Sequence, residues 1–128
     1  MEMARALRVL VVEDHADTAA SLAALLRLEG HIVDVAPDGA TALQIAHQLP
    51  PDVALLDIGL PGIDGHQVAK QLREQRNDKR PLLVATTGHG SNEDRLLSDA
   101  AGIDLHLVKP VNPEQLQALL KRFETLVQ

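Results

Sequence analysis

The sequence predicts an α/β fold in which five parallel strands form one doubly wound sheet. Short apolar runs alternate along the chain with longer segments of helical period, and this alternation is typical of βαβ units. The first of these runs, near Arg8–Glu13, is apolar on both faces, as the strands of a buried parallel sheet are. A length of 128 residues suits one domain, so we expect a single domain over residues 1–128. Right-handed crossovers would place helices on both faces of such a sheet.

The strands are predicted from runs rich in β-branched residues or leucine that end in turn residues or polar side chains. Their order in the sheet does not follow from periodicity alone. The strands are expected at Arg8–Glu13, Ile32–Ala36, Val53–Asp57, Leu82–Thr86 and Asp104–Lys109.

A helix is expected after each strand. The first runs from about Ala16 to Leu28, and Gly30 stops it because glycine readily adopts a left-handed backbone. The second follows Pro37-Asp38-Gly39 and ends at Pro50-Pro51, where helical hydrogen bonding cannot continue. The third carries Val68, Ala69 and Leu72, the fourth begins at Ser91, and the fifth follows Asn112 as N-cap, with Pro113 in its first turn.

The composition argues against several classes of protein. There is no cysteine, which excludes disulfides and thiolate zinc sites. A net charge of −6 and a single aromatic residue, Phe123, argue against direct binding of nucleic acid. The basic residues Arg73, Arg76, Lys79 and Arg80 are interpreted as a solvated helix end and loop. No stretch is typical of a signal peptide or a membrane span, so we expect a cytoplasmic protein that does not contact a membrane directly.

Polar side chains stand at the carboxyl ends of four predicted strands. Glu13 and Asp14 follow the first run, Asp57 the third, Thr87 the fourth and Lys109 the fifth. In an open parallel sheet these ends line one crevice, where ligands bind. Two like charges about 4 Å apart repel by roughly 4 kcal/mol at an effective dielectric near 20. One lysine does not offset three carboxylates, so we expect the cluster to bind a cation.

The same residue types suit phosphoryl transfer. The Asp57 carboxylate can attack phosphorus and form an aspartyl phosphate. Glu13 and Asp14 supply the hard oxygen ligands that Mg²⁺ prefers. Thr87 can donate a hydrogen bond to one phosphoryl oxygen, and Lys109 can place its charge beside another. The plainer alternative is that each acid only caps the helix that follows it.

Four stretches of the chain resemble the receiver domain of two-component response regulators. They are Val11-Val12-Glu13-Asp14, Leu55 to Gly65, Ala85-Thr86-Thr87-Gly88 and Leu107-Val108-Lys109-Pro110. Each stretch is a weak signal alone, but four in this order and at these spacings are highly specific. The resemblance covers essentially the full length and implies a flavodoxin-like (βα)5 fold with the strand order 2-1-3-4-5.

The resemblance also implies a function. Asp57 would accept a phosphoryl group from a phosphohistidine on a histidine kinase or a histidine phosphotransfer domain. Glu13, Asp14 and Asp57, with the backbone carbonyl of Gly59, would hold Mg²⁺. Thr87 would be the switch hydroxyl and Lys109 the phosphate contact, with a cis Lys109-Pro110 bond. Phosphorylation would then change the surface formed by the fourth helix, the fifth strand and the fifth helix.

Several residues in or beside these motifs are expected to influence the switch. Strand alternation places Thr86 and Thr87 on opposite faces, and the glycine that follows favours Thr87 as the switch, with Thr86 as a strand filler. His106 stands where many receivers have Tyr or Phe, so we expect an altered aromatic half of the switch. His89 and Gly59 are expected to set the lifetime of the phosphoryl group.

Two other functions compete with a phosphorylation-controlled switch. A haloacid-dehalogenase-type phosphatase needs a second aspartate two residues after its nucleophile, and this chain has Gly59 there, so we expect no separate substrate turnover. A receiver-like module that binds partners without phosphate is the other alternative, and the intact site residues weigh against it. The chain is expected to be a stand-alone regulator or a receiver cut from a longer protein. A hybrid sensor kinase is favoured as that parent because Thr87-Gly88-His89-Gly90 resembles such receivers.

Overall fold

Five parallel strands form one sheet in the order β2-β1-β3-β4-β5 in the computed structural model. The structure describes residues 6–58, 65–75, 81–87 and 102–126. This architecture confirms the predicted α/β class and the strand order that the resemblance implied. The strands are β1 (Arg8–Val12), β2 (Ile32–Ala36), β3 (Val53–Asp57), β4 (Leu82–Thr87) and β5 (Leu105–Val108).

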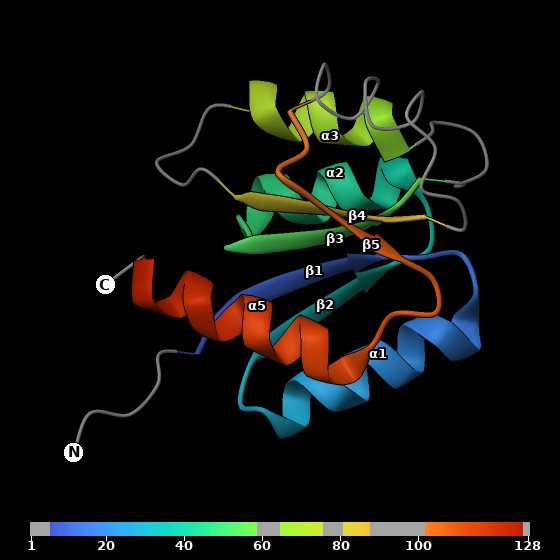
Figure 1. Cartoon of the computed structure of the whole chain (residues 1–128). Helices are drawn as coiled ribbons and strands as arrows, with labels where there is room; N and C mark the ends of the chain where they lie inside the picture. Colours follow the sequence, from blue (N-terminus) through green and yellow to red (C-terminus); the bar gives the residue numbers. More distant parts are fainter. Residues whose placement is uncertain (1–5, 59–64, 76–80, 88–101, 127–128) are drawn as a thin grey trace.

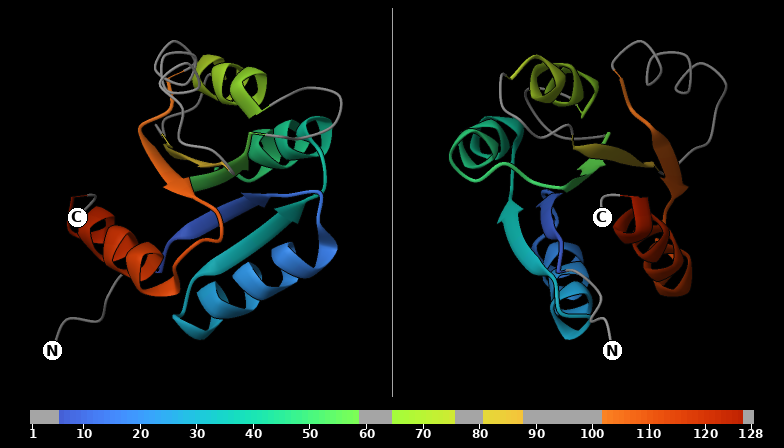
Figure 2. Two further views of the ribbon diagram at one scale, coloured as in Figure 1. Left: turned by 45° about the vertical axis from the view of Figure 1, so that its right-hand side comes forward. Right: turned by 90° about the vertical axis from the view of Figure 1, so that its left-hand side faces the viewer.

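Helices cover both faces of the sheet, so that the domain has three layers. On one face lie α1 (Ala16–Leu28) and α5 (Pro113–Leu126), and on the other lie α2 (Gly39–Gln48) and α3 (Gly65–Glu74) (Figures 1 and 2). The helix predicted to begin at Ser91 lies outside the described residues. Among the helices that the structure describes, none has the length and apolar character needed to cross a membrane.

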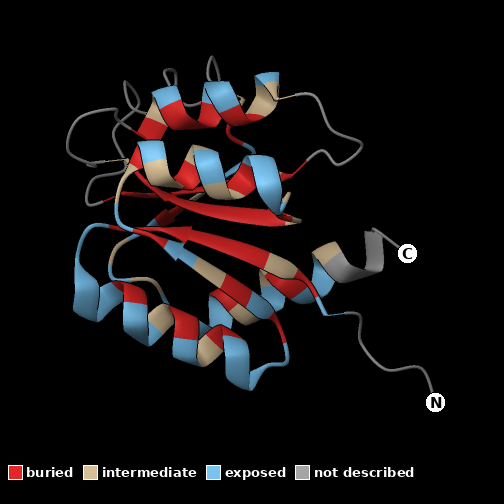
Figure 3. Ribbon diagram, turned by 180° about the vertical axis from the view of Figure 1, so that it is seen from behind, coloured by how far each residue is buried: buried red, intermediate tan, exposed pale blue. Residues whose placement is uncertain are grey.

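The side chains of each strand alternate between two cores. In β3, Val53 and Leu55 pack in the core beneath α1 and α5, whereas Ala54 and Leu56 pack in the core beneath α2 and α3. Figure 3 shows the result in β1, β3 and β4, which are buried along most of their length. Because alternation continues to the strand ends, Asp57 belongs to the face of the sheet that α1 and α5 cover.

Local signals in the sequence fix several helix ends. Gly30 has a φ of 92° directly after α1, as predicted for a left-handed stop. The Asp38 carboxylate accepts a hydrogen bond of 2.8 Å from the Thr41 N–H at the start of α2, and this bond lowers the pKa of Asp38. Asn112 caps α5 by accepting bonds from the backbone N–H groups of Glu114 and Gln115.

Several details differ from the expectations. β1 ends at Val12 rather than at Glu13, and β5 spans Leu105–Val108 rather than Asp104–Lys109. β4 extends to Thr87, one residue beyond the predicted end, because the Thr87 carbonyl still accepts a bond of 2.7 Å from the Lys109 N–H. Arg73 does not lie at a solvated helix end: its side chain is 16% exposed and donates to the carbonyls of Pro81 and Gly102 and to Asp104. The basic residues Arg76, Lys79 and Arg80 lie outside the described residues.

Candidate metal centre at the strand ends

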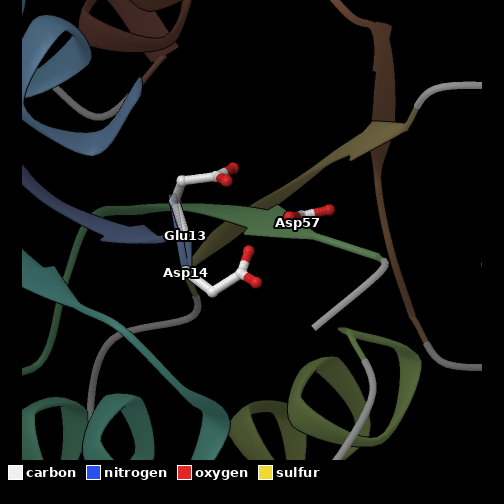
Figure 4. Close-up of side chains that lie close together, drawn as sticks. All are labelled: Glu13, Asp14 and Asp57. Carbon is white, nitrogen blue, oxygen red and sulfur yellow. The ribbon is translucent and has the colours of Figure 1, made fainter. Parts of the chain in front are cut away.

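Three carboxylates meet where β1 and β3 end. β1 and β3 are paired in register up to Val12 and Leu56, so the residues that follow them emerge side by side. One oxygen from each of Glu13, Asp14 and Asp57 lies within 4.8 Å of the other two (Figure 4). The structure therefore brings together the acids that the sequence analysis placed in one crevice.

The three acids differ in their exposure to solvent. Glu13 and Asp57 are buried, at 4% and 6% exposed, whereas Asp14 is exposed. One Glu13 oxygen accepts a hydrogen bond of 3.2 Å from the His15 N–H. Solvent therefore reaches the cluster at Asp14, whereas Glu13 and Asp57 are largely covered.

Lys109 is the cation that balances part of this charge. Its Nζ lies 3.0 Å from Asp57 Oδ2 and 3.3 Å from Glu13 Oε2. Partial burial lowers the pKa of Lys109, but the hydrogen bonds and charges of Asp57 and Glu13 outweigh it, so the pKa is raised above its ordinary value. The Lys109-Pro110 bond is cis, as the resemblance implied. Among the described residues of this cluster, one ammonium stands beside three carboxylates, which leaves an acidic excess.

The two threonines at the end of β4 take different positions. Thr87 is the last residue of the strand and is 7% exposed. Thr86 is 4% exposed, and its hydroxyl donates to the Leu56 carbonyl at 3.4 Å. Thr86 also lines the groove that Glu13 and Lys109 line, whereas the alternation of β4 directs Thr87 to the opposite face. The sequence analysis had treated Thr86 only as a filler of the strand.

The start of α3 approaches the end of β3 closely, and this contact depends on Gly65. A Cβ atom at Gly65 would lie 2.7 Å from both the Asp57 carbonyl oxygen and the Ile58 Cα. Such distances are far shorter than normal van der Waals contacts, so a side chain here would push α3 away from Asp57. From the sequence, Gly65 is predicted to belong to a flexible glycine-rich loop after the third strand, but it is the first residue of α3. Its contact with β3 depends on how α3 packs on the sheet.

Other predicted site residues are placed only in part. Gly59 and His89 lie outside the described residues. His106 is half-buried and lines a pocket between β5 and α5 together with Leu105, Gln115 and Phe123.

The donor set fits Mg²⁺. Mg²⁺ prefers oxygen ligands at 2.0–2.1 Å, so two oxygens on opposite sides of the ion are about 4.2 Å apart. One carboxylate oxygen from each of Glu13, Asp14 and Asp57 lies within 4.8 Å of the other two, so small side-chain movements bring these oxygens to such spacings. A divalent ion also relieves the repulsion that the single lysine leaves.

The fold and this acidic strand-end site define a class of α/β domains that bind a cation and a phosphoryl group at the carboxyl edge of the sheet. Comparison with known families is more specific. The family model of the response regulator receiver domain matches residues 9–121. The chain therefore belongs to the response regulator receiver family, whose members are switch domains of two-component signalling controlled by phosphorylation.

Individual relatives agree with this assignment. The chain is 37% identical over 126 residues to the two-component response regulator PhoP of Pseudomonas aeruginosa, covering 95% of this chain and 55% of PhoP. It is 44% identical over 114 residues to the transcriptional regulatory protein PrrA of Mycobacterium leprae, covering 89% of this chain and 48% of PrrA. The chain thus spans about half the length of these curated relatives.

Solved structures give the same fold. The chemotaxis protein CheY4 of Vibrio cholerae superimposes with a TM-score of 0.87 at 31% identity, covering 93% of this chain and 99% of CheY4. The receiver domain of the sensor histidine kinase PA1611 from Pseudomonas aeruginosa superimposes with a TM-score of 0.84 at 30% identity, covering 94% of this chain and 99% of that domain. In that structure a magnesium ion is coordinated in the active-site cleft.

Proposed function

We propose that Asp57 accepts a phosphoryl group from a phosphohistidine in a Mg²⁺-dependent reaction, and that this modification switches the signalling state of the domain. The observation that carries the proposal is the position of the Asp57 carboxylate. It lies within 4.8 Å of Glu13 and Asp14 and 3.0 Å from the Lys109 ammonium. A nucleophilic oxygen, metal ligands and a fixed cation are thereby assembled around one point.

The reaction is a single displacement at phosphorus. An Asp57 carboxylate oxygen attacks the phosphorus atom and forms an O–P bond, while the P–N bond of the phosphohistidine breaks and its electron pair stays with the imidazole. When bound by Glu13, Asp14, Asp57 and the Gly59 carbonyl, Mg²⁺ would supply positive charge for the phosphoryl oxygens. Lys109 holds the Asp57 carboxylate in the resting state and contacts a phosphoryl oxygen afterwards.

The switch is a shift between two populations. Thr87 donates its hydroxyl to the new phosphoryl group, and the segment after β4 follows. His106 lies in β5 at the position where many receivers have Tyr or Phe, so the aromatic half of this switch is altered. The surface of the fourth helix, β5 and α5 then reports the phosphorylation state to a partner.

A groove beside the site suits the phosphoryl donor. It lies between α1 and the connection from β5 to α5, has a volume of about 760 Å³, and has Glu13 and Lys109 among its lining residues. The apolar residues Leu22, Leu25 and Val111 line it as well. A histidine kinase or histidine phosphotransfer domain that packs against these residues would bring its phosphohistidine to Asp57. Because such donors act inside the cell, we assign the domain to the cytoplasm.

The proposed role is that of a phosphoacceptor without separate substrate turnover. A phosphatase of the haloacid-dehalogenase type would need a general acid at position 59, where the chain has glycine. The competing function is a module that binds its partner without phosphate, and it predicts no chemistry at Asp57.

The test is the intact mass of the protein after incubation with acetyl phosphate, with Mg²⁺ and with EDTA. Wild type is expected to gain one phosphoryl group only with Mg²⁺, and Asp57→Asn is expected to gain none. Asp52→Asn is the matched control, because Asp52 directly precedes the other end of the same strand, where it accepts a hydrogen bond from the Arg8 N–H. No gain by wild type under any condition would favour the phosphate-independent module.

A further inference from the structure

Thr86 lies beside Asp57 on the neighbouring strand. The two residues are Cα partners in the register between β3 and β4. Two residues earlier on each strand, Leu55 and Val84 both pack in the core beneath α1 and α5. Because side chains alternate with a period of two, Asp57 and Thr86 continue on that same face. Adjacent strands are about 4.8 Å apart, so the two side chains stand next to each other.

Thr86 lies among the residues of the proposed phosphorylation site. Its side chain lines the groove that Glu13 and Lys109 line, and the residue is 4% exposed. By the same alternation, Glu13 and Lys109 also continue on the face of their cored neighbours Val11 and Leu107. Thr86 is therefore part of the wall that faces the Asp57 carboxylate.

The hydrogen bond that the Thr86 hydroxyl makes in this structure is too long to compensate for the burial of a polar group. The hydroxyl donates to the Leu56 carbonyl at 3.4 Å, whereas hydroxyl donors normally lie about 2.7–2.8 Å from their acceptors. A valine would fill the same space and would bury no polar atom. A long bond of this kind is readily exchanged for a stronger one to a charged oxygen.

We propose that Thr86 supplies a second hydroxyl to the phosphoryl group on Asp57. Rotation about the Thr86 side chain moves the proton from the Leu56 carbonyl toward a phosphoryl oxygen, and no covalent bond changes. Thr87 approaches from the opposite face of β4, so the two hydroxyls contact different oxygens. This inference rests on the proposed function, because the phosphoryl group is the ligand.

The test uses a stable phosphoryl analogue. Calorimetry measures the binding of beryllium fluoride in the presence of Mg²⁺, and of Mg²⁺ alone, to wild type, Thr86→Val and Thr86→Ser. The fluorides of the analogue take the places of the phosphoryl oxygens. Loss of one hydrogen bond to such a charged acceptor predicts that Thr86→Val binds the analogue about tenfold more weakly, while Thr86→Ser stays close to wild type. Mg²⁺ alone is expected to bind all three proteins equally, because Thr86 is not a ligand to the ion.

Several results would overturn this assignment. Equal analogue binding by wild type and Thr86→Val would reject the second hydroxyl and leave the proposed function intact. Analogue binding by Thr86→Ser as weak as that of Thr86→Val would also reject it, since the hydroxyl would then not be the cause. A parallel loss of Mg²⁺ affinity would indicate a distorted pocket and a structural role. Failure of wild type to bind the analogue would reject both the proposed function and the role of Thr86.

Discussion

The two ends of the sheet differ in how their charged side chains are paired. At the amino ends of the strands, cations and anions are matched: Arg73 reaches Asp104 and two backbone carbonyls, and Arg8 pairs with Asp34 at 2.9 Å. At the carboxyl ends, three carboxylates lie together, and the Lys109 ammonium pairs with two of them, Glu13 and Asp57. The matched end stabilises the fold. The unmatched end holds charge that repels itself, and such an excess makes physical sense as a site kept for a cation and a phosphoryl group.

The largest expected effect on stability comes from removing the charge pairing at the amino ends of the strands. Arg73→Met removes three donors from acceptors at the starts of β4 and β5 and leaves the Asp104 carboxylate without its cation. We expect the free energy of unfolding to fall by about 3 kcal/mol. Urea denaturation measures this loss, with Arg122→Met as a control because Arg122 is exposed on α5.

Arg73→Met also tests whether charge pairing at the amino ends affects stability without affecting the chemistry at the carboxyl ends. Phosphorylation of Asp57 by acetyl phosphate is expected to proceed at the wild-type rate under conditions in which the variant is folded. A loss of stability below 1 kcal/mol (roughly that of one ordinary hydrogen bond), or a slower phosphorylation, would contradict the separation.

An intermediate effect on stability is expected from disrupting the packing of α3 against the end of β3, beside the carboxylate cluster. Gly65→Ala forces a Cβ to within 2.7 Å of the Asp57 carbonyl oxygen, so α3 and the end of β3 must separate. We expect a loss of about 2 kcal/mol and a Mg²⁺ affinity several-fold weaker than that of wild type.

Gly30→Ala is the matched control for Gly65→Ala. Gly30 has a φ of 92°, where an alanine is strained by about 1–2 kcal/mol, and a Cβ there would meet no atom within 4 Å. This variant is expected to lose stability without any change in Mg²⁺ affinity. If both variants bound Mg²⁺ as wild type does, the contact of Gly65 with Asp57 would not matter for the site.

The smallest effect concerns the pH dependence of the Lys109 interactions. The pKa of Lys109 is raised in the folded state, so these interactions stabilise the fold fully below the unfolded-state value of 10.5. That stabilisation is lost as the pH rises through the folded-state pKa, which lies above 10.5. The side chain is 31% exposed, so solvent screening keeps the contribution below about 1 kcal/mol.

The comparison of wild type with Lys109→Met isolates this contribution. In EDTA, the difference between their free energies of unfolding is expected to be constant at pH 8–9 and to shrink above pH 10.5. A difference that grows with pH in that range would have the wrong sign for a raised pKa.

Much of the fold and most of the site residues were predictable from the sequence. The central strands β1 and β3 are continuous apolar runs, so their ends are visible as the first charged residue, at Glu13 and Asp57. The carboxyl ends of parallel strands share one edge, which is why separated residues could be assigned to one site. The strand order required the family resemblance, because periodicity does not say which strands are neighbours.

The remaining features depend on packing between distant parts of the chain. Arg73 has the sequence context of a solvated helix end. Its side chain nevertheless donates to Gly102 and Asp104, which lie 29 and 31 positions further along the chain. Thr86 reads as a strand filler until the register places it opposite Asp57. Local patterns carry no information on such contacts.

The most direct test of the account is the effect of Mg²⁺ on the stability of wild type and Asp14→Asn. Asp14 is exposed and belongs to the carboxylate cluster, so removing its charge relieves repulsion without opening the core. In EDTA we expect Asp14→Asn to be more stable than wild type by about 1 kcal/mol in urea denaturation.

With Mg²⁺ at about ten times its dissociation constant, wild type is expected to gain about 1.4 kcal/mol. Asp14→Asn is expected to gain much less, so that its advantage disappears. Equal stability of the two proteins in EDTA, together with an equal response to Mg²⁺, would contradict the claim that the acidic excess at the carboxyl ends is held for a cation.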